Sequence, residues 1–389
     1  MRYIRPDYYD DFKCIADKCP DTCCAGWQIM IDEDTLERYE AVATDKADEF
    51  CKRMEASVDW QEGAFKQCHG RCAMLNEQNL CDLVIQKGEA WLCETCDRYP
   101  RHIEEFDGVR EMSLSLSCPV AAQMMLEREE PMKFLVEENE EPDPLEEEFE
   151  DFDFLLFTQL EDARNVLFAI AQNREMPMQE RLELLMQMAK DMQACVDEER
   201  LYDMESVIER YGKWEEESKC SNVRADKEAL TPGILDAEKR YGYLKENFAV
   251  FHEMERLREE WTEVLTQAEN VLYVNGYERY CRICEEFQQD FIATFGEQKW
   301  EIFLEQILMF FLYTYFCGAV YDDWIYSKVA MAVFSVCYIQ EFIMSAWHQA
   351  NRQMDMQECI RMAYRYAREV EHSDENLNLL EEWLMEEVL

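Results

Sequence analysis

Cysteine is the residue type whose number and spacing in this sequence most directly suggest chemistry. The chain has 18 cysteines in 389 residues, and eleven of them fall within the first 118. Short spacings let one turn of chain present two sulfurs to a metal, while longer loops bring in further ligands. The predicted metal ligands are Cys14, Cys19, Cys23, Cys24, Cys72, Cys81, Cys93, Cys96 and Cys118.

Two kinds of metal centre fit this spacing. Cys68 and Cys72, taken with the pair Cys93 and Cys96, resemble a four-cysteine zinc site in which the metal stabilises the fold. An iron–sulfur cluster also takes four thiolates and does not require that spacing. The Cys-x3-Cys-x2-Cys triad of radical enzymes is absent from the first cluster, because Cys24 follows Cys23 directly. Spacing alone leaves zinc and iron–sulfur open.

The adjacent pair Cys23 and Cys24 requires a special backbone if both thiols are to bind one centre. Neighbouring side chains in extended chain point to opposite faces. A sharp turn would bring them together, and Ala25-Gly26 supplies a suitable sequence for it. Without that turn, one of the two is expected to be a buried thiol.

Other residues near the cysteines have ordinary interpretations beside their chemical ones. His69 and His102 could bind metal, but histidines in loops are usually hydrogen-bonded surface residues. Glu94, Asp97 and Tyr99 could serve as a base, yet such residues are usually found on the surface or in packing. Cys281 and Cys284 share a face of one predicted helix, where core packing is the simpler interpretation.

Composition excludes several classes of protein. With 39 basic and 85 acidic residues the net charge is −46, so a nucleic-acid partner is not expected. The 11 glycines are widely spaced, which excludes a P-loop and a GxGxxG dinucleotide site. Few glycines and prolines also argue against a many-stranded sandwich or barrel. The opening residues lack a signal-peptide pattern, so we expect a reducing, cytoplasmic setting in which dense cysteines hold metal rather than form disulfides.

The elements that position the cysteines are predicted to be short and irregular. We predict a mainly α protein, with a small cysteine-rich α+β metal domain at residues 1–125 and a larger all-helical domain at 154–389. Between them, 126–153 is predicted to be an acidic linker, since residues 137–153 hold eleven acidic and no basic side chains.

Helical periodicity is clear in the second half of the chain. Apolar residues recur at three- and four-residue steps after Pro177, from Phe251 to Ala268, and after Asp374, which is a candidate N-cap. The longest apolar run, 307–321, is shorter than a membrane span and is followed by two aspartates, so we expect buried core helices and no membrane partner.

At its N-terminus the sequence resembles the flagellin lysine-N-methylases, the FliB family. The resemblance covers about residues 1–120, and its later part is shared with a broader group of cysteine-cluster, zinc- or iron-chelating domains. It is carried by Pro6, Tyr9, Phe12, Cys14, Cys19, the run Asp21-Thr22-Cys23-Cys24-Ala25-Gly26-Trp27, Ile31-Asp32, Cys72 to Leu75, Leu80-Cys81, Leu92-Cys93, Cys96 and Tyr99-Pro100-Arg101.

The resemblance implies a function and its cofactors. It implies methylation of lysine ε-amines on flagellin, with S-adenosylmethionine as methyl donor and a [4Fe-4S] cluster bound by N-terminal cysteines. A lysine amine attacks a methyl sulfonium only when it is neutral, so such a site must desolvate the amine or offer a base. Two alternatives stay open: a zinc- or iron-chelating interaction module without methyltransferase activity, and a redox sensor using low-pKa thiols.

Overall fold

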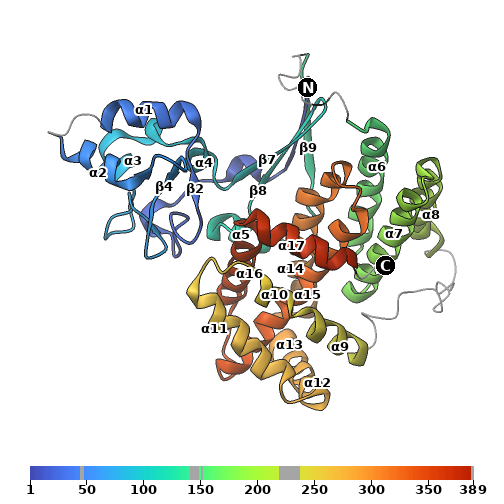
Figure 1. Ribbon diagram of the computed structural model, residues 1–389. Coiled ribbons are helices and arrows are strands. Elements are labelled where there is room, and N and C mark those ends of the chain that lie inside the picture. Colours follow the sequence, from blue (N-terminus) through green and yellow to red (C-terminus); the bar gives the residue numbers. More distant parts are fainter. Residues whose placement is uncertain (44–47, 141–148, 150–151, 219–236, 387–389) are drawn as a thin grey trace.

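The structure, a computed structural model, describes residues 1–43, 48–140, 149, 152–218 and 237–386. Figure 1 shows a small lobe built from the early part of the chain, a sheet beside it, and a larger helical body. The predicted fold class is confirmed, because helices dominate and the N-terminal part mixes short helices with short strands.

A four-stranded sheet joins the lobe to the helical body. Its strands are β1 (Arg2–Pro6), β7 (Arg101–Phe106), β8 (Val109–Leu114) and β9 (Phe134–Glu138), in the order β7-β8-β1-β9. Strand β1 is parallel to β8 and antiparallel to β9, so the first residues of the chain lie in the middle of the sheet. The Tyr313 hydroxyl donates to the Ile4 carbonyl at 2.9 Å, which ties the sheet to the body.

The lobe is inserted between β1 and β7. Its described residues contain one three-stranded and one two-stranded sheet of two-residue strands and four short α-helices, and the connections between them are turns and loops. The helices are α1 (Glu33–Ala43), α2 (Glu49–Ser57), α3 (Asp82–Lys87) and α4 (Glu94–Arg98). The strands are β2 (Ile29–Met30), β3 (Val58–Asp59), β4 (Ala64–Phe65), β5 (Gln67–Cys68) and β6 (Arg71–Cys72).

The lobe has a hydrophobic core of its own, separate from that of the body. Its buried members are Ile29, Ile31, Tyr39, Phe50, Cys51, Met54, Val58, Phe65, Cys72, Met74, Leu83 and Cys93. Three more predicted ligands, Cys24, Cys81 and Cys96, pack against the edge of this core, because thiols are small and readily buried. The lobe core is therefore built partly from the predicted metal ligands.

Among the described residues, the rest of the fold consists mainly of twelve α-helices of the body and one α-helix that follows strand β8. The latter is α5 (Pro119–Leu126). The others are α6 (Phe154–Ala171), α7 (Met178–Asp197), α8 (Met204–Ser218), α9 (Ala237–Asn247), α10 (Val250–Glu253), α11 (Glu259–Ala268), α12 (Tyr277–Glu286), α13 (Ala293–Phe295), α14 (Glu297–Tyr315), α15 (Ile325–Gln349), α16 (Met356–Glu371) and α17 (Asp374–Glu386).

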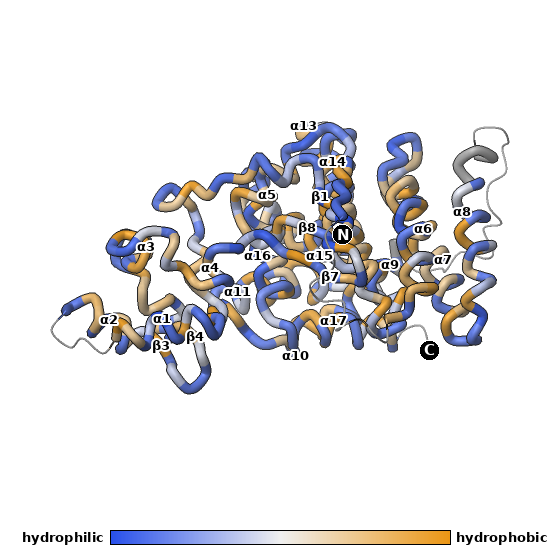
Figure 2. The backbone as a smooth tube through the Cα atoms, turned by 90° about the horizontal axis from the view of Figure 1, so that it is seen from above, coloured by the Kyte–Doolittle hydropathy of each residue, from blue (hydrophilic) through white to orange (hydrophobic). Residues whose placement is uncertain are grey.

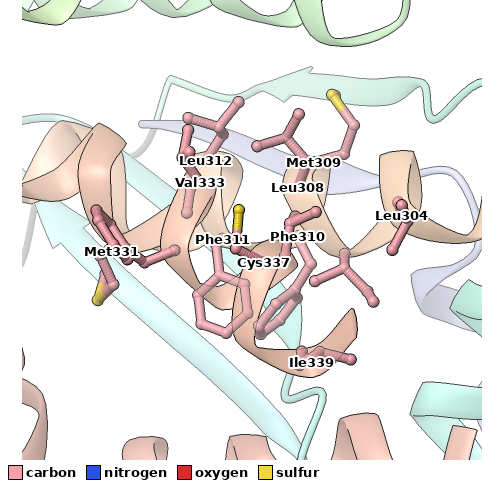
Figure 3. Packing of buried hydrophobic residues seen from close by; sticks show 14 of the residues in the cluster. Leu304, Leu308, Met309, Phe310, Phe311, Leu312, Met331, Val333, Cys337 and Ile339 are labelled. Carbon is pink, nitrogen blue, oxygen red and sulfur yellow. The ribbon is translucent and has the colours of Figure 1, made fainter. Parts of the chain in front are cut away.

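Helices α14 and α15 form the centre of the body. Figure 3 shows Phe310 and Phe311 of α14 packed beside Cys337 and Ile339 of α15. The helical stretches 297–320 and 325–349 are each long and apolar enough to span a membrane, but 89% of each apolar window is buried inside the protein. The prediction of buried core helices is confirmed.

Periodicity located some helices well and others less well. The helix predicted after Pro177 is α7, and Figure 2 shows hydrophobic and hydrophilic residues alternating along α6 and α7 as an amphipathic helix requires. The stretch from Phe251 to Ala268 is instead broken into α10 and α11, because Arg258 adopts extended backbone. At α17 the capping side chain is Ser373, whose hydroxyl accepts the Asn376 N–H, and not Asp374.

The core of the body extends beyond residues 154–389. Ile4, Phe106, Leu126 and Met132 belong to the same hydrophobic cluster as α14 and α15. Strand β9 lies within the segment predicted as an acidic linker, of which residues 141–148 and 150–151 lie outside the described residues. The sheet and α5 thus pack as part of the body, while the predicted domain boundaries stay a prediction.

Candidate metal centre and its junction with the helical body

The nine predicted ligands fall into two neighbourhoods, judged by which thiols influence one another electrostatically. The lobe set lies in or against the lobe core and consists of Cys24, Cys72, Cys81, Cys93 and Cys96. The junction set lies toward the helical body and consists of Cys14, Cys19, Cys23 and Cys118. The adjacent residues Cys23 and Cys24 link the two sets, because their thiols lie within hydrogen-bonding reach of each other. Cys23 is also influenced by Cys118, whereas Cys24 influences Cys72 and Cys81.

Backbone pairing brings the segments of the lobe set together. The Cys72 N–H donates to the Cys24 carbonyl at 2.9 Å, and the Gly26 N–H donates to the Gly70 carbonyl at 2.8 Å. The hairpin of β5 and β6 thus lies alongside the turn that follows Cys24. Burial, together with the charges of the neighbouring thiols of Cys24, Cys81 and Cys93, raises the pKa of Cys72 to about 12.

Three predicted ligands occupy helix N-caps. Cys81 precedes α3, Cys93 precedes α4 and Cys118 precedes α5. Burial raises the pKa of Cys81 and of Cys118, and backbone N–H groups of the following turn oppose that rise. A helix N-terminus stabilises a thiolate, which is the form that binds metal.

Two pairs of thiols lie close enough to change each other's ionisation. A hydrogen bond with Cys23 lowers the pKa of Cys24 to about 7, while the same bond and burial raise the pKa of Cys23. A hydrogen bond with Cys96 likewise lowers the pKa of Cys93 and raises that of its partner. Each pair therefore contains one thiol that ionises more easily than an ordinary cysteine.

Among the described residues, no group of three or more His, Cys, Asp or Glu side chains is arranged to hold a metal ion. The donors themselves still suit a soft metal, since thiolates select zinc and iron–sulfur clusters. Five thiols of the lobe set influence one another around a core that has few other apolar residues. In chemistry and number, the lobe set fits a four-thiolate centre.

The predicted turn at Ala25-Gly26 is confirmed, and it has a second role. Gly26 has a φ of +89°, a conformation that glycine adopts easily. A Cβ atom at this position would lie 2.7 Å from the Arg258 Nε. Glycine is therefore needed both for the turn and for the approach of an arginine from the helical body.

Arginines of the helical body hold the cysteine segment in place. Arg258 forms an ion pair with Asp21 at 3.0 Å and donates to the Ala25 carbonyl at 2.8 Å. Arg368 of α16 pairs with the same aspartate at 2.6 Å and donates to the Ser117 carbonyl at 2.8 Å. Asp21 lies between Cys19 and Cys23, so the junction set is fixed directly to the body.

An aromatic cluster completes this junction. The His372 ring lies 4.8 Å from Trp27 and 5.7 Å from Tyr99, measured between ring centroids. The Trp27 Nε1 donates to the Cys23 carbonyl at 2.7 Å. Burial, followed by the charges of Arg368 and Arg258, lowers the pKa of His372 to about 3.

A cavity of about 360 Å³ opens at the same junction. It is lined by the Pro20-Asp21 segment together with residues of α11 and α16, including Arg258, Trp261 and Glu369. A second hollow of about 710 Å³ lies on the lobe and is lined mainly by carboxylates: Asp32, Glu33, Asp34, Glu89, Glu94 and Asp97. The first joins the two regions, and the second belongs to the lobe alone.

The helical half of the chain matches a known protein family. The model of the FliB lysine N-methylase C-terminal domain matches residues 164–389, which is more than half of the chain. The chain belongs to the FliB lysine N-methylase family. That assignment confirms the resemblance inferred from the N-terminal cysteine pattern, and it does so from the helical half, which the resemblance did not cover.

Curated relatives carry related names. Over 126 residues the chain is 29% identical to the lysine-N-methylases of Salmonella choleraesuis and Salmonella typhimurium, and the match spans 31% of this chain and 31% of each of theirs. It is also 29% identical to the flagellar biosynthetic protein FliU of Salmonella muenchen, of which the match covers 75%. The chain thus matches about a third of the length of the two methylases. No solved structure matches it.

The other residues considered as metal ligands or bases from the sequence lie in ordinary surface or packing environments. His69 is exposed in the turn between β5 and β6, and His102 lies 3.1 Å from Glu104 on the exposed face of β7. Cys284 packs against the core of the body, in keeping with the packing interpretation. Tyr99 is half-buried at the junction, and its hydroxyl lies 3.0 Å from the Ser117 hydroxyl.

Sequence reasoning missed the residues of the body that meet the cysteine segment. Arg258, Arg368, Glu369 and His372 lie far from the cysteines along the chain, and only folding brings them close. One signal was present, because arginines recur at steps of four and three along the apolar helix α16, at Arg361, Arg365 and Arg368. A basic stripe on a helix that is otherwise buried indicates an acidic partner segment.

Proposed function

We propose that this protein is a protein lysine N-methyltransferase that modifies flagellin with S-adenosylmethionine as donor. Membership of the FliB lysine N-methylase family is the observation that carries this proposal. In the reaction, a neutral lysine ε-amine forms a new N–CH3 bond as the S–CH3 bond of the donor breaks. S-adenosylhomocysteine then leaves, and the proton of the original ammonium passes to a base or to water.

We further propose that the lobe set binds a [4Fe-4S] cluster. Five mutually influencing thiols supply more than the four thiolates that such a cluster takes. When bound, the cluster would supply a metal centre that stabilises the lobe and lies on the same side of the molecule as the junction. The junction set would keep the Asp21 segment against the helical body, through the contacts of Arg258 and Arg368.

The acidic surface of the lobe supports a lysine-bearing substrate. Six carboxylates and one arginine, Arg38, line the larger hollow, and the chain as a whole carries a net charge of −46. A strongly negative surface attracts a basic segment and raises its local concentration. Cytoplasmic flagellin is the substrate that the family resemblance implies, and we propose it as the partner.

Methyl transfer to purified flagellin tests the proposal directly. The protein is purified without oxygen and incubated with flagellin and S-adenosylmethionine, and mass spectrometry then locates any added 14 Da on flagellin lysines. We expect lysine methylation that depends on the donor. A matched reaction uses Cys72→Ser, which removes one thiol of the lobe set, beside Cys68→Ser, which removes an exposed thiol of the same hairpin.

The outcome separates the two leading functions. Methylation by the parent protein and by Cys68→Ser, with loss in Cys72→Ser, supports a methyltransferase that depends on the lobe set. Cluster-loaded protein that leaves flagellin unmodified contradicts the methyltransferase. In that case, stoichiometric zinc in the same preparation favours the metal-chelating interaction module.

A further inference from the structure

Two ionisable side chains that line the cavity at the junction, Glu369 and Arg365, have hydrogen-bonding capacity that the protein does not use. Glu369 of α16 is 2% exposed, its Oε2 accepts the Leu257 N–H at 3.2 Å, and its Oε1 has no hydrogen-bond partner. Arg365, one helical turn earlier, is half-buried and makes no hydrogen bond or ion pair with any residue that the structure describes. Both side chains line the same cavity.

A buried carboxylate oxygen without a donor is costly, because burial removes its hydration. In a binding site, a ligand can supply the missing donor. A guanidinium without a protein acceptor in the same cavity can bind an anion, most favourably a carboxylate held by two parallel hydrogen bonds. A ligand that satisfies both Glu369 and Arg365 would carry a cationic donor and an anionic acceptor a short distance apart.

The free end of an α-amino acid has this pair of groups. Among the reactants of the proposed function, only the donor keeps them, since S-adenosylmethionine has a free α-ammonium and a free α-carboxylate. A lysine within flagellin has its own α-amino and α-carboxyl groups in peptide bonds and offers an ammonium alone. The charges in the cavity therefore match the methyl donor better than the methyl acceptor.

Size and lining agree with this match. About 360 Å³ lies within the range of about 300–1,000 Å³ that is usual for small-molecule sites. Trp261 and Tyr364 contribute aromatic surface, which attracts cations such as a sulfonium. The wall opposite α16 is Pro20 and Asp21, between Cys19 and Cys23, so a ligand here would lie beside the junction set.

We propose that the cavity between the Pro20-Asp21 segment and helices α11 and α16 binds the amino-acid end of S-adenosylmethionine, with Arg365 holding the carboxylate and Glu369 the ammonium. This inference rests on the proposed function and adds the site of the donor to it. It also explains why the cysteine segment is fixed to α16 by Arg368 and to the start of α11 by Arg258.

Calorimetric titration of the full-length protein, purified without oxygen, tests the site. The variants are Arg365→Gln and Glu369→Gln, each with a control of equal charge change on an exposed helix surface: Arg282→Gln on α12 and Glu382→Gln on α17. We expect each cavity variant to weaken S-adenosylmethionine binding by at least about tenfold, as for loss of a charge-assisted hydrogen bond. The controls should stay within about twofold.

Decarboxylated S-adenosylmethionine identifies the role of Arg365. It lacks the carboxylate, so Arg365→Gln should leave its affinity within about twofold of the value for the parent protein. A tenfold loss for both ligands would instead indicate a damaged cavity, and it would overturn the assignment of Arg365.

The remaining outcomes separate the site from the function. If the parent protein binds S-adenosylmethionine and both cavity variants bind it equally well, the donor site lies elsewhere and the proposed function still stands. If the parent protein does not bind S-adenosylmethionine at all, the proposed function and this site both fail. If the variants weaken binding of a lysine peptide but not of S-adenosylmethionine, the cavity is an acceptor site and the proposal is wrong.

Discussion

The lobe and the helical body are held together by different means. The body buries a continuous cluster of large apolar side chains that extends from the sheet through α14, α15 and α16. The lobe core contains twelve buried apolar residues, three of them cysteines, within about 85 residues of short helices, short strands and loops. Domains of this size rarely reach useful stability from a small core alone, and metals or disulfides usually supplement it.

The difference teaches where each region obtains its stability. The core of the body consists mainly of large apolar side chains, whereas cysteines form part of the core of the lobe. If the lobe set binds the metal that we propose, metal-binding free energy adds to the folding free energy of the lobe. The junction couples the two, because Asp21 contacts arginines that belong to the body.

Removing the metal should have the largest effect and should act on the lobe alone. In Cys72→Ser we expect loss of bound metal and early proteolysis within residues 13–99, because a structural metal can contribute about 10 kcal/mol. The helical body should keep its own unfolding transition. Limited trypsin digestion with mass spectrometry and metal analysis measures both effects.

Cys68→Ser is the matched control for this change. Cys68 is exposed in the same hairpin, whereas Cys72 is 6% exposed in the lobe core. Equal metal loss in the two variants, or simultaneous unfolding of lobe and body in Cys72→Ser, would contradict the division of stability described above.

A truncation in the body should show the reverse pattern. Phe311 of α14 is fully buried, and its ring lies 6.5 Å from that of Tyr366 on α16. Phe311→Ala should lower the free energy of unfolding of the body by about 3–5 kcal/mol, through lost contacts and the cavity left behind. Urea denaturation followed by circular dichroism measures this, and an unchanged metal content would show that the lobe is intact.

A glycine substitution at the junction tests the contact between the two regions. Gly26→Ala combines a positive φ with a clash against Arg258, whereas Gly108→Ala has a φ of +66° and open space around its Cβ. We expect about 1 kcal/mol of destabilisation for Gly108→Ala and at least about 1 kcal/mol more for Gly26→Ala. Thermal unfolding of the two variants side by side decides this, and equal losses would mean that Arg258 moves aside freely.

Acid should weaken the junction through His372. Its pKa of about 3 in the folded protein lies below the ordinary 6.5, so folding keeps this ring neutral. As the pH falls below 6.5, His372 binds a proton in the unfolded chain but not in the folded one. The free energy of unfolding therefore falls by up to about 1.4 kcal/mol per pH unit. Above pH 6.5 the contribution of His372 is fully present.

The neighbouring carboxyl group has the opposite sign, so a variant is needed to isolate the histidine. Burial raises the pKa of Glu371 to about 7, which makes its contribution to stability increase as the pH falls toward 4.5. We therefore expect the loss of stability between pH 7 and pH 5 to be smaller in His372→Gln than in the parent protein. Identical slopes in urea unfolding at the two pH values would show that His372 does not carry the effect.

Sequence patterns predicted the helical half better than the site. Periodic apolar residues located α7 and the buried pair α14 and α15, because each helix must hide one face or all of its surface. Local periodicity could not show that the Glu369 carboxylate would accept the Leu257 N–H. Leu257 lies where the chain breaks between α10 and α11. That contact joins residues 112 positions apart and exists only in the folded chain.

For the site, the cysteines could be found from the sequence and their partners could not. Spacing marked the thiols and the Ala25-Gly26 turn, since both are local properties of the chain. The placement of Cys23 near Cys118 and of Cys24 near Cys72 depends on the start of α5 and on the β5–β6 hairpin. The cavity depends on three segments, near residues 20, 260 and 365, that no local pattern connects.

The most direct test of the central claim is metal analysis of the protein purified without oxygen. The account places a four-thiolate iron–sulfur cluster in the lobe set. It predicts about four irons and four sulfides per chain, with a broad absorption band at about 400 nm. A colourless protein with one zinc per chain and no sulfide would contradict the cluster, although the lobe would still depend on a metal.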